Sequence, residues 1–111
     1  MKKIKFYKLC RDRENHANYL AVGYGVKYTV RRDGRAITFY GESHGRGGYY
    51  ITEAITGMAM NSHANASEAA DFVRMNFTMI YNLLCDYINK GATVQNMLAE
   101  GCRVEEAQGV I

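Results

Sequence analysis

The sequence predicts an α+β fold: a small antiparallel β-sheet of three to four strands, packed on one face by a long C-terminal helix, with one or two shorter helices. Residues 26–42 alternate between apolar and polar side chains around Asp33-Gly34, a pattern typical of a β-hairpin. Residues 67–89 instead place apolar side chains at helical spacing. We therefore expect a single domain, residues 1–111, with a basic β-meander and Gly-rich loop in 1–48 and a helical part in 49–111.

The strands are expected at residues 3–9, from about 19 to 32, and at 35–42. Asp33-Gly34 predicts a two-residue turn, because both residues tolerate the positive φ that a type I′ turn needs. This turn fixes the register, which pairs Arg32 with Arg35, Val30 with Ile37 and Tyr28 with Phe39. Gly23 and Gly25 lie inside the second strand, where glycine is typical of a bulge or of a close approach by another backbone.

The predicted register separates two faces of the hairpin. The apolar face, expected in the core, holds Val26, Tyr28, Val30, Ile37 and Phe39. The opposite face, expected to meet solvent, holds Lys27, Thr29, Arg31, Ala36, Thr38 and Tyr40. Lys3, Lys5 and Tyr7 of the first strand are interpreted as an extension of this basic surface.

The second half of the chain is predicted to be mainly helical. Residues 51–60 fit a helical period only loosely, and we favour a short helix over a fourth strand. Asn65 or Ser67 is expected to cap the long helix, which ends near Lys90 with Gly91 after it. Thr93 is expected to cap a last short helix, and residues 102–111 show no clear pattern.

The long helix has more apolar surface than one sheet face needs. Phe72, Met79 and Leu83 widen its apolar stripe to an arc of roughly 200°, whereas about 100° covers a sheet. We expect this surface to be buried within the chain. The alternative is a homodimer through these three residues.

Positive charge is concentrated in the first part of the chain. Residues 1–46 hold eleven Lys and Arg against four acids, a net charge of +7, whereas residues 47–111 have a net charge of −4. This asymmetry suggests a face for an anionic partner. Basic residues also serve as ordinary solvent-facing and edge-protecting residues of strands.

The favoured hypothesis is a small non-enzymatic binding protein for nucleic acid or a nucleotide-like anionic ligand. Its candidate ligand-binding residues are Lys27, Arg31, Arg32, Arg35, Tyr40, His44 and Arg46. Lys and Arg bind phosphates, and exposed bases stack on tyrosine. The last two residues belong to the Gly-rich loop 41–48, which could cradle a phosphate but matches no known phosphate-loop spacing.

The alternative function is a protein–protein interaction module, a small regulator or inhibitor that docks on a nucleic-acid-handling enzyme or another acidic protein surface. Tyr and Arg are enriched at such interfaces. No catalytic, metal or cofactor site is expected, because Cys and His lack metal-ligand spacing and no nucleophile–base motif is present. Three widely spaced cysteines favour a reducing, cytoplasmic location, and no segment is apolar enough to cross a membrane.

Overall fold

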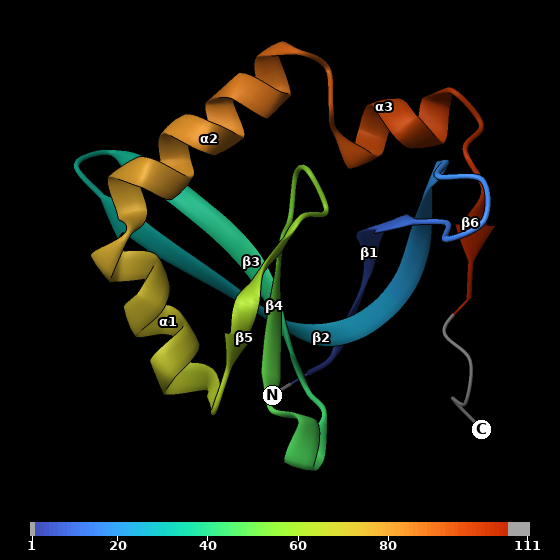
Figure 1. The fold of residues 1–111 in the computed structure, drawn as a ribbon. Coiled ribbons are helices and arrows are strands. Elements are labelled where there is room, and N and C mark those ends of the chain that lie inside the picture. Colours follow the sequence, from blue (N-terminus) through green and yellow to red (C-terminus); the bar gives the residue numbers. More distant parts are fainter. Residues whose placement is uncertain (1, 107–111) are drawn as a thin grey trace.

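The computed structural model describes residues 2–106 and confirms the α+β class (Figure 1). The sheet has six strands instead of three to four. In chain order the elements are β1 (Ile4–Arg11), β2 (Asn18–Arg32), β3 (Arg35–Ser43), a 3-10 turn (Gly45–Gly47), β4 (Tyr49–Glu53), β5 (Ala59–His63), α1 (Ala66–Met75), α2 (Phe77–Asn89), α3 (Val94–Ala99) and β6 (Val104–Glu105).

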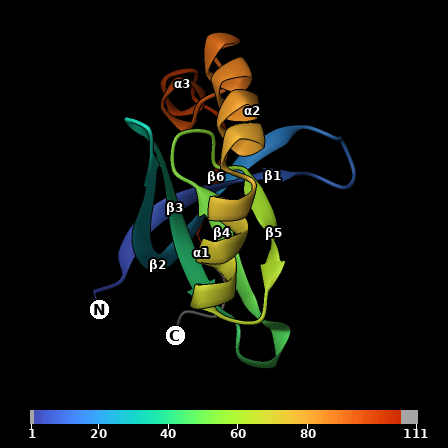
Figure 2. The same cartoon turned by 90° about the vertical axis from the view of Figure 1, so that its left-hand side faces the viewer.

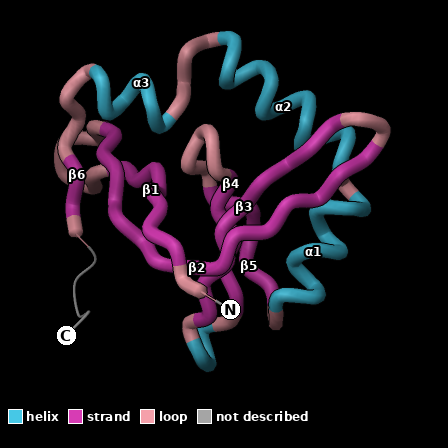
Figure 3. Tube along the Cα trace, turned by 180° about the vertical axis from the view of Figure 1, so that it is seen from behind, coloured by secondary structure: helices cyan, strands magenta, loops and turns pink. Residues whose placement is uncertain are grey.

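The first five strands follow one another in the order β1-β2-β3-β4-β5, and each pairs antiparallel with its neighbour. The short β6 runs parallel to β2 at Leu20 and Ala21. β2 is long enough to pair with β1 through its first half and with β3 through its second half. Figure 3 shows this strand curving between the two parts of the sheet.

The β2–β3 hairpin has the predicted register. Arg32 pairs with Arg35, Val30 with Ile37 and Tyr28 with Phe39. Asp33 and Gly34 have φ values of 51° and 76°, as the two-residue turn requires. Val30, Ile37 and Phe39 are buried, while Lys27, Thr29 and Arg31 are exposed.

The predicted continuation of the basic face onto the first strand is wrong. Phe6 pairs with Gly23, so Phe6 shares a face with Lys27, and Lys5 and Tyr7 lie on the other face of the sheet. The glycines of β2 allow a close approach here: a Cβ on Gly25 would lie 2.4 Å from the carbonyl oxygen of Gly41. The sheet can therefore bend at this point and bring β1 close to β3.

The prediction of a helix at residues 51–60 is also wrong. The segment forms β4 and β5, because it pairs with the edge of β3 from Phe39 to Ser43. Ile51 is 1% exposed and Ile55 is 50% exposed, so the two apolar residues do not share a helical face. Pairing with a neighbouring strand decides the structure of a segment whose own periodicity is weak.

The predicted long helix is present as α1 and α2, with Asn76 between them (Figure 2). The Asn65 side chain accepts a hydrogen bond from the Glu68 N–H at 2.9 Å and caps α1, as expected. Thr93 caps α3 in the same way through the Asn96 N–H at 3.1 Å. None of the helices in residues 2–106 has the length and apolarity needed to span a membrane.

The core lies between α1 and α2 and one face of the sheet. Its members are the buried Val30, Ile37, Phe39, Tyr49, Ile51, Ala69, Val73, Phe77, Ile80 and Leu84. Phe72 is half-buried and packs beside His63 of β5, with ring centroids 4.9 Å apart. Met79 and Leu83 remain 62% and 49% exposed, so the structure buries the wide apolar arc only in part.

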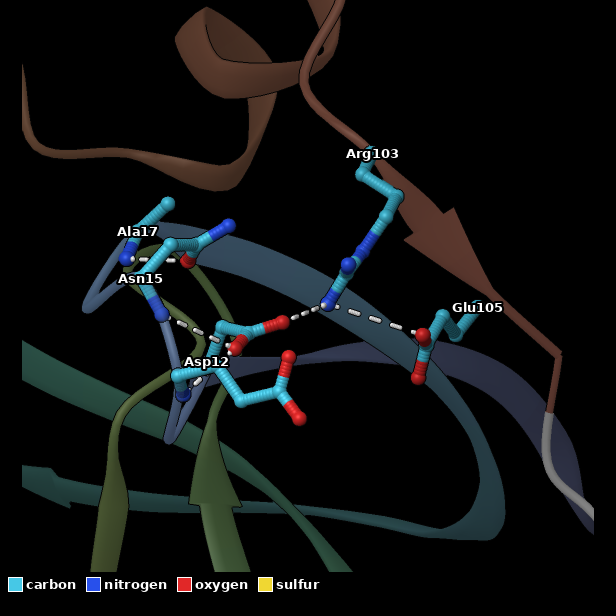
Figure 4. Close-up of polar contacts among 6 residues, drawn as sticks. Asp12, Asn15, Ala17, Arg103 and Glu105 are labelled. Atoms are coloured by element: carbon cyan, nitrogen blue, oxygen red, sulfur yellow. Dashed lines mark hydrogen bonds and ion pairs between the residues drawn. The ribbon is translucent and has the colours of Figure 1, made fainter.

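The end of the described chain is tied to the β1–β2 loop (Figure 4). Arg103, just before β6, forms ion pairs with Asp12 at 3.2 Å and Glu105 at 3.5 Å. Its guanidinium also lies 4.2 Å from the centroid of the Tyr19 ring. The backbone adds a hydrogen bond from the Leu20 N–H to the Arg103 carbonyl at 3.0 Å. Of the segment 102–111, residues 107–111 lie outside the described chain.

Candidate functional site

The end of the β2–β3 hairpin is an exposed group of arginines. Arg31, Arg32 and Arg35 stand next to the turn, and all three are exposed. The ion pairs within residues 2–106 involve none of them. β4 pairs with β3 only from Phe39 onward, so this end of the hairpin extends beyond the central sheet. No ion pair within residues 2–106 therefore neutralises the positive charge of this hairpin end.

A fourth arginine comes from α1. Arg74 lines one hollow with Arg31 and Arg32, and the hollow encloses about 560 Å³. Val30 and Phe77 supply apolar lining, and Met75 lies at its side with 83% exposure. Arg74 pairs with Asp71 at 2.9 Å, and this exposed pair leaves an excess of positive charge around the hollow. We call Arg31, Arg32, Arg35 and Arg74 the arginine cluster.

Arg35 is held against α2. Its guanidinium carbon lies 5.2 Å from the centroid of the Tyr81 ring, within the range of a cation–π contact. Such a contact orients the side chain and leaves its charge unneutralised. The hydroxyl oxygens of Thr29 and Thr38, 3.0 Å apart on the opposite face of the hairpin, add a cross-strand hydrogen bond. These two contacts hold the end of the hairpin against α2 and link its two strands.

Lys27 and Tyr40 lie in a second hollow, between the hairpin and α2. They face each other across the β2–β3 pair. The Tyr40 ring is half-buried and stacks on Phe6, with centroids 4.7 Å apart and planes 1° apart. One face of this ring is thus occupied by Phe6, so at most its other face can stack on a base or another flat group.

His44 and Arg46 lie in the loop between β3 and β4. His44 lines two other hollows, and neither residue lines the hollow of Arg31 and Arg74 or the second hollow. His44 is 3.9 Å from a carboxylate oxygen of Glu42, which also pairs with Lys8 at 3.2 Å. The N–H groups of His44, Gly47 and Gly48 donate to carbonyls within the loop. A phosphate cradle built from these groups would have to break these bonds. The structure thus separates the predicted residues into three places.

Sequence reasoning missed Arg74 as a member of the site. Arg74 is far from the hairpin in sequence, and only the packing of α1 beside β2 brings it there. Tyr81 and Cys85 lie in the predicted long helix but were not assigned to a site, and both line the second hollow. No local pattern marks these residues, because their role depends on where α2 crosses the hairpin.

The described part of the chain contains no candidate metal site. Across residues 2–106, no group of three or more His, Cys, Asp or Glu side chains is placed to hold a metal ion. Cys10, Cys85 and Cys102 are free thiols. Comparisons with known protein families, with curated proteins and with solved structures found no match to this chain.

Proposed function

We propose that this protein is a non-enzymatic binding protein that engages nucleic acid through its arginine cluster. The single observation that supports this most strongly is the exposed end of the hairpin, where three arginines lack an acidic partner among residues 2–106 and Arg74 joins them. Arginine binds phosphate oxygens through paired N–H groups. A two-stranded ribbon of this kind also fits the major groove of duplex DNA.

The salt dependence of binding tests this proposal. The logarithm of the binding constant should fall with the logarithm of salt concentration by about 0.9 per phosphate neutralised on duplex DNA, and by about 0.7 on a single strand. The double variant Arg31→Ala/Arg35→Ala should reduce the slope by roughly two phosphates. Arg13→Ala/Lys90→Ala removes two exposed charges elsewhere and serves as the matched control.

Fluorescence anisotropy on labelled single-stranded and double-stranded oligonucleotides provides the measurement. Absence of binding at micromolar protein in about 50 mM salt would overturn the proposal, since even non-specific binders reach dissociation constants of about 10⁻⁴–10⁻⁶ M at physiological salt. Equal effects of the two double variants would also count against it, because the hairpin would then contribute only general charge.

A second candidate function is docking on a protein. Met75, Met79 and Leu83 are exposed side chains of α1 and α2, and Met75 lines the same hollow as Arg31 and Arg74. Arginine and methionine are both enriched in protein–protein interfaces. The partner in this case is an acidic surface, such as that of a nucleic-acid-handling enzyme that the protein would regulate. Recovery of one protein partner that survives nuclease treatment would favour this function over the first.

Two further predictions from the sequence stay open. Self-association through Met79 and Leu83 predicts a mass that rises with concentration in sedimentation equilibrium, and Met79→Lys should abolish the rise. Phe72, the third residue of the predicted dimer surface, is half-buried and packs partly against the core. The free thiols support a reducing, cytoplasmic location.

A further inference from the structure

The second hollow has the dimensions and lining of a small-molecule site. It has a volume of about 430 Å³ between the hairpin and α2, and Glu53, Ala54 and Ile55 at the β4–β5 turn also line it. Ligand sites in proteins span about 300–1,000 Å³ and are mainly apolar, with a few polar groups. Three members of the arginine cluster, Arg31, Arg32 and Arg74, line a different hollow at the end of the hairpin, whereas Arg35 contacts the Tyr81 ring of this one.

Two tyrosine rings of fixed orientation line the hollow. Tyr40, on the hairpin, stacks on Phe6 at 4.7 Å, and Tyr81, on α2, stacks on Phe77 at 5.9 Å with planes 11° apart. The Arg35 guanidinium carbon also lies 5.2 Å from the centroid of the Tyr81 ring. Because each ring is held by a neighbour, the two aromatic walls need little ordering when a ligand enters. Aromatic side chains favour stacked or edge contacts with flat rings.

Apolar side chains complete the lining. Leu84 is buried there, while Ile55 and Ile88 are 50% and 37% exposed at the same hollow. A ligand that covers the two isoleucines would remove apolar surface from water, which favours binding. The lining thus suits a molecule with a flat apolar body.

Lys27 and Glu53 are the charged residues that line the hollow, and Arg35 lies beside its Tyr81 ring. Lys27 is exposed and takes no part in the ion pairs of the described residues 2–106. Glu53 also lines the hollow, but its carboxylate accepts hydrogen bonds from the N–H groups of Ile55 and Thr56 and from the Thr56 hydroxyl, at 2.9, 2.7 and 2.7 Å. The carboxylate oxygens of Glu53 are therefore directed to its own turn, and Lys27 together with Arg35 beside Tyr81 outweighs its negative charge, which favours an anionic group.

We infer that this hollow binds a small aromatic organic anion, such as an aromatic carboxylate or sulfonate. The aromatic body packs against the Tyr40 ring and the apolar side chains beside Tyr81, and the acidic group meets the Lys27 ammonium. This site stands on its own residues and does not require the nucleic-acid proposal.

Cys85 provides a reporter inside the hollow. Its thiol lines the hollow and is half-buried, whereas Cys10 and Cys102 are half-buried elsewhere. The probe is anilinonaphthalene sulfonate, a fluorescent aromatic sulfonate, titrated into the folded protein. Saturating probe should slow alkylation of Cys85 by N-ethylmaleimide about tenfold, which corresponds to 90% occupancy, and leave Cys10 and Cys102 unchanged. Peptide mass mapping measures the three rates.

Two variants connect the binding to the proposed residues. Lys27→Gln should weaken the affinity for the probe about fivefold, because it removes one charge pair that is partly exposed to solvent. Lys5→Gln changes an exposed lysine on β1 and should leave this affinity unchanged. Ala36→Phe should block the hollow from its exposed edge. The near-ultraviolet circular dichroism of each variant verifies that it is folded.

Slower alkylation of Cys85 that is lost in Ala36→Phe would support the inference. Probe binding without protection of Cys85 would overturn it, because the probe would then occupy another surface. Equal affinities for Lys27→Gln and Lys5→Gln would overturn the choice of an anion. No probe binding at millimolar concentration would overturn the site itself.

Discussion

The β2–β3 and β4–β5 connections both join neighbouring antiparallel strands, yet they are built in opposite ways. The first needs only its own two residues, Asp33 and Gly34, whose positive φ values close the turn locally. The second spans residues 54–58 and depends on the rest of the molecule. Its backbone forms hydrogen bonds with three other elements. The Ala54 N–H donates to the Thr38 carbonyl of β3, and the carbonyls of Gly57 and Ile55 accept from the N–H groups of Leu9 in β1 and Val94 in α3.

A buried acid organises the second connection. Glu53 is 2% exposed, and its carboxylate accepts three hydrogen bonds from Ile55 and Thr56. A charged group is tolerated at such burial only when hydrogen bonds replace its hydration. The contrast shows why the first turn was predictable from sequence and the second was not: one is specified by neighbouring residues, the other by long-range contacts.

The largest effect is expected where the hairpin meets the core. Ile37 is 1% exposed, and Ile37→Ala should lower the free energy of unfolding by about 2–5 kcal/mol because it removes buried apolar volume. Arg31→Ala, on the exposed face of the paired strand, should change it by about 0.5 kcal/mol or less. Urea unfolding of both variants provides the measurement. Similar losses would show that the hairpin does not bury the face we describe.

The second prediction tests the buried acid of the β4–β5 turn. Glu53→Ala should destabilise the protein by about 1–3 kcal/mol, because the N–H groups of Ile55 and Thr56 lose their acceptors. Glu14→Ala, an exposed acid of the β1–β2 loop, is the control and should stay within about 0.5 kcal/mol. A neutral result for Glu53→Ala in denaturant unfolding would mean that the turn does not need its carboxylate.

The third prediction concerns the locally specified turn. Gly34 has a φ of 76° and open space around it, so Gly34→Ala should cost about 1–2 kcal/mol from backbone strain alone. Gly47 lies in the loop after β3 and would place a Cβ 3.5 Å from its nearest neighbour without positive φ, so Gly47→Ala is the matched control. Thermal unfolding should separate the two variants. Equal melting temperatures would contradict the assigned turn.

The difference between local and long-range contacts also explains which features of this chain could be predicted from its sequence. Hairpin register, helix caps at Asn65 and Thr93, and the class of fold follow from residues close together in sequence, and the structure agrees. The identity of residues 51–60 depended on pairing with β3, which local periodicity does not contain.

Some residues of the candidate site were likewise predictable from local sequence, and others depend on long-range packing. Arg31, Arg32 and Arg35 could be placed together because the turn fixes the register. Arg74 could not be assigned to them, since helix packing brings it there. Tyr40 was expected on an open face, but the bend of β2 near Gly25 brings Phe6 over its ring. Local chemistry thus identified side chains, and tertiary contacts determined their surroundings.

The smallest expected effect comes from a third connection, the β1–β2 loop, which uses the partly exposed carboxylate of Asp12 where the β4–β5 turn uses a buried one. The N–H of Glu14 at 2.8 Å, and then that of Asn15 at 3.3 Å, hold the pKa of Asp12 below its ordinary value, and Arg103 adds to this (Figure 4). A pKa lowered by folding stabilises the folded protein above the unfolded pKa of about 3.9, and this contribution is lost as the pH falls through the folded value.

Asp12→Asn keeps the shape of the side chain and removes its titration. We therefore expect wild type to be slightly more stable than Asp12→Asn at pH 5–7, with a difference that shrinks toward zero as the pH approaches 3. Urea unfolding from pH 3 to pH 7 measures this, and an NMR titration of the Asp12 carboxyl group reports its pKa directly. Glu14→Gln, whose side chain is exposed in the same loop, should show a weaker pH dependence. A difference in stability between wild type and Asp12→Asn that grows as the pH falls would contradict the expected sign of the effect. The Asp12 carboxylate would then not stabilise its loop in the way that Glu53 stabilises the β4–β5 turn.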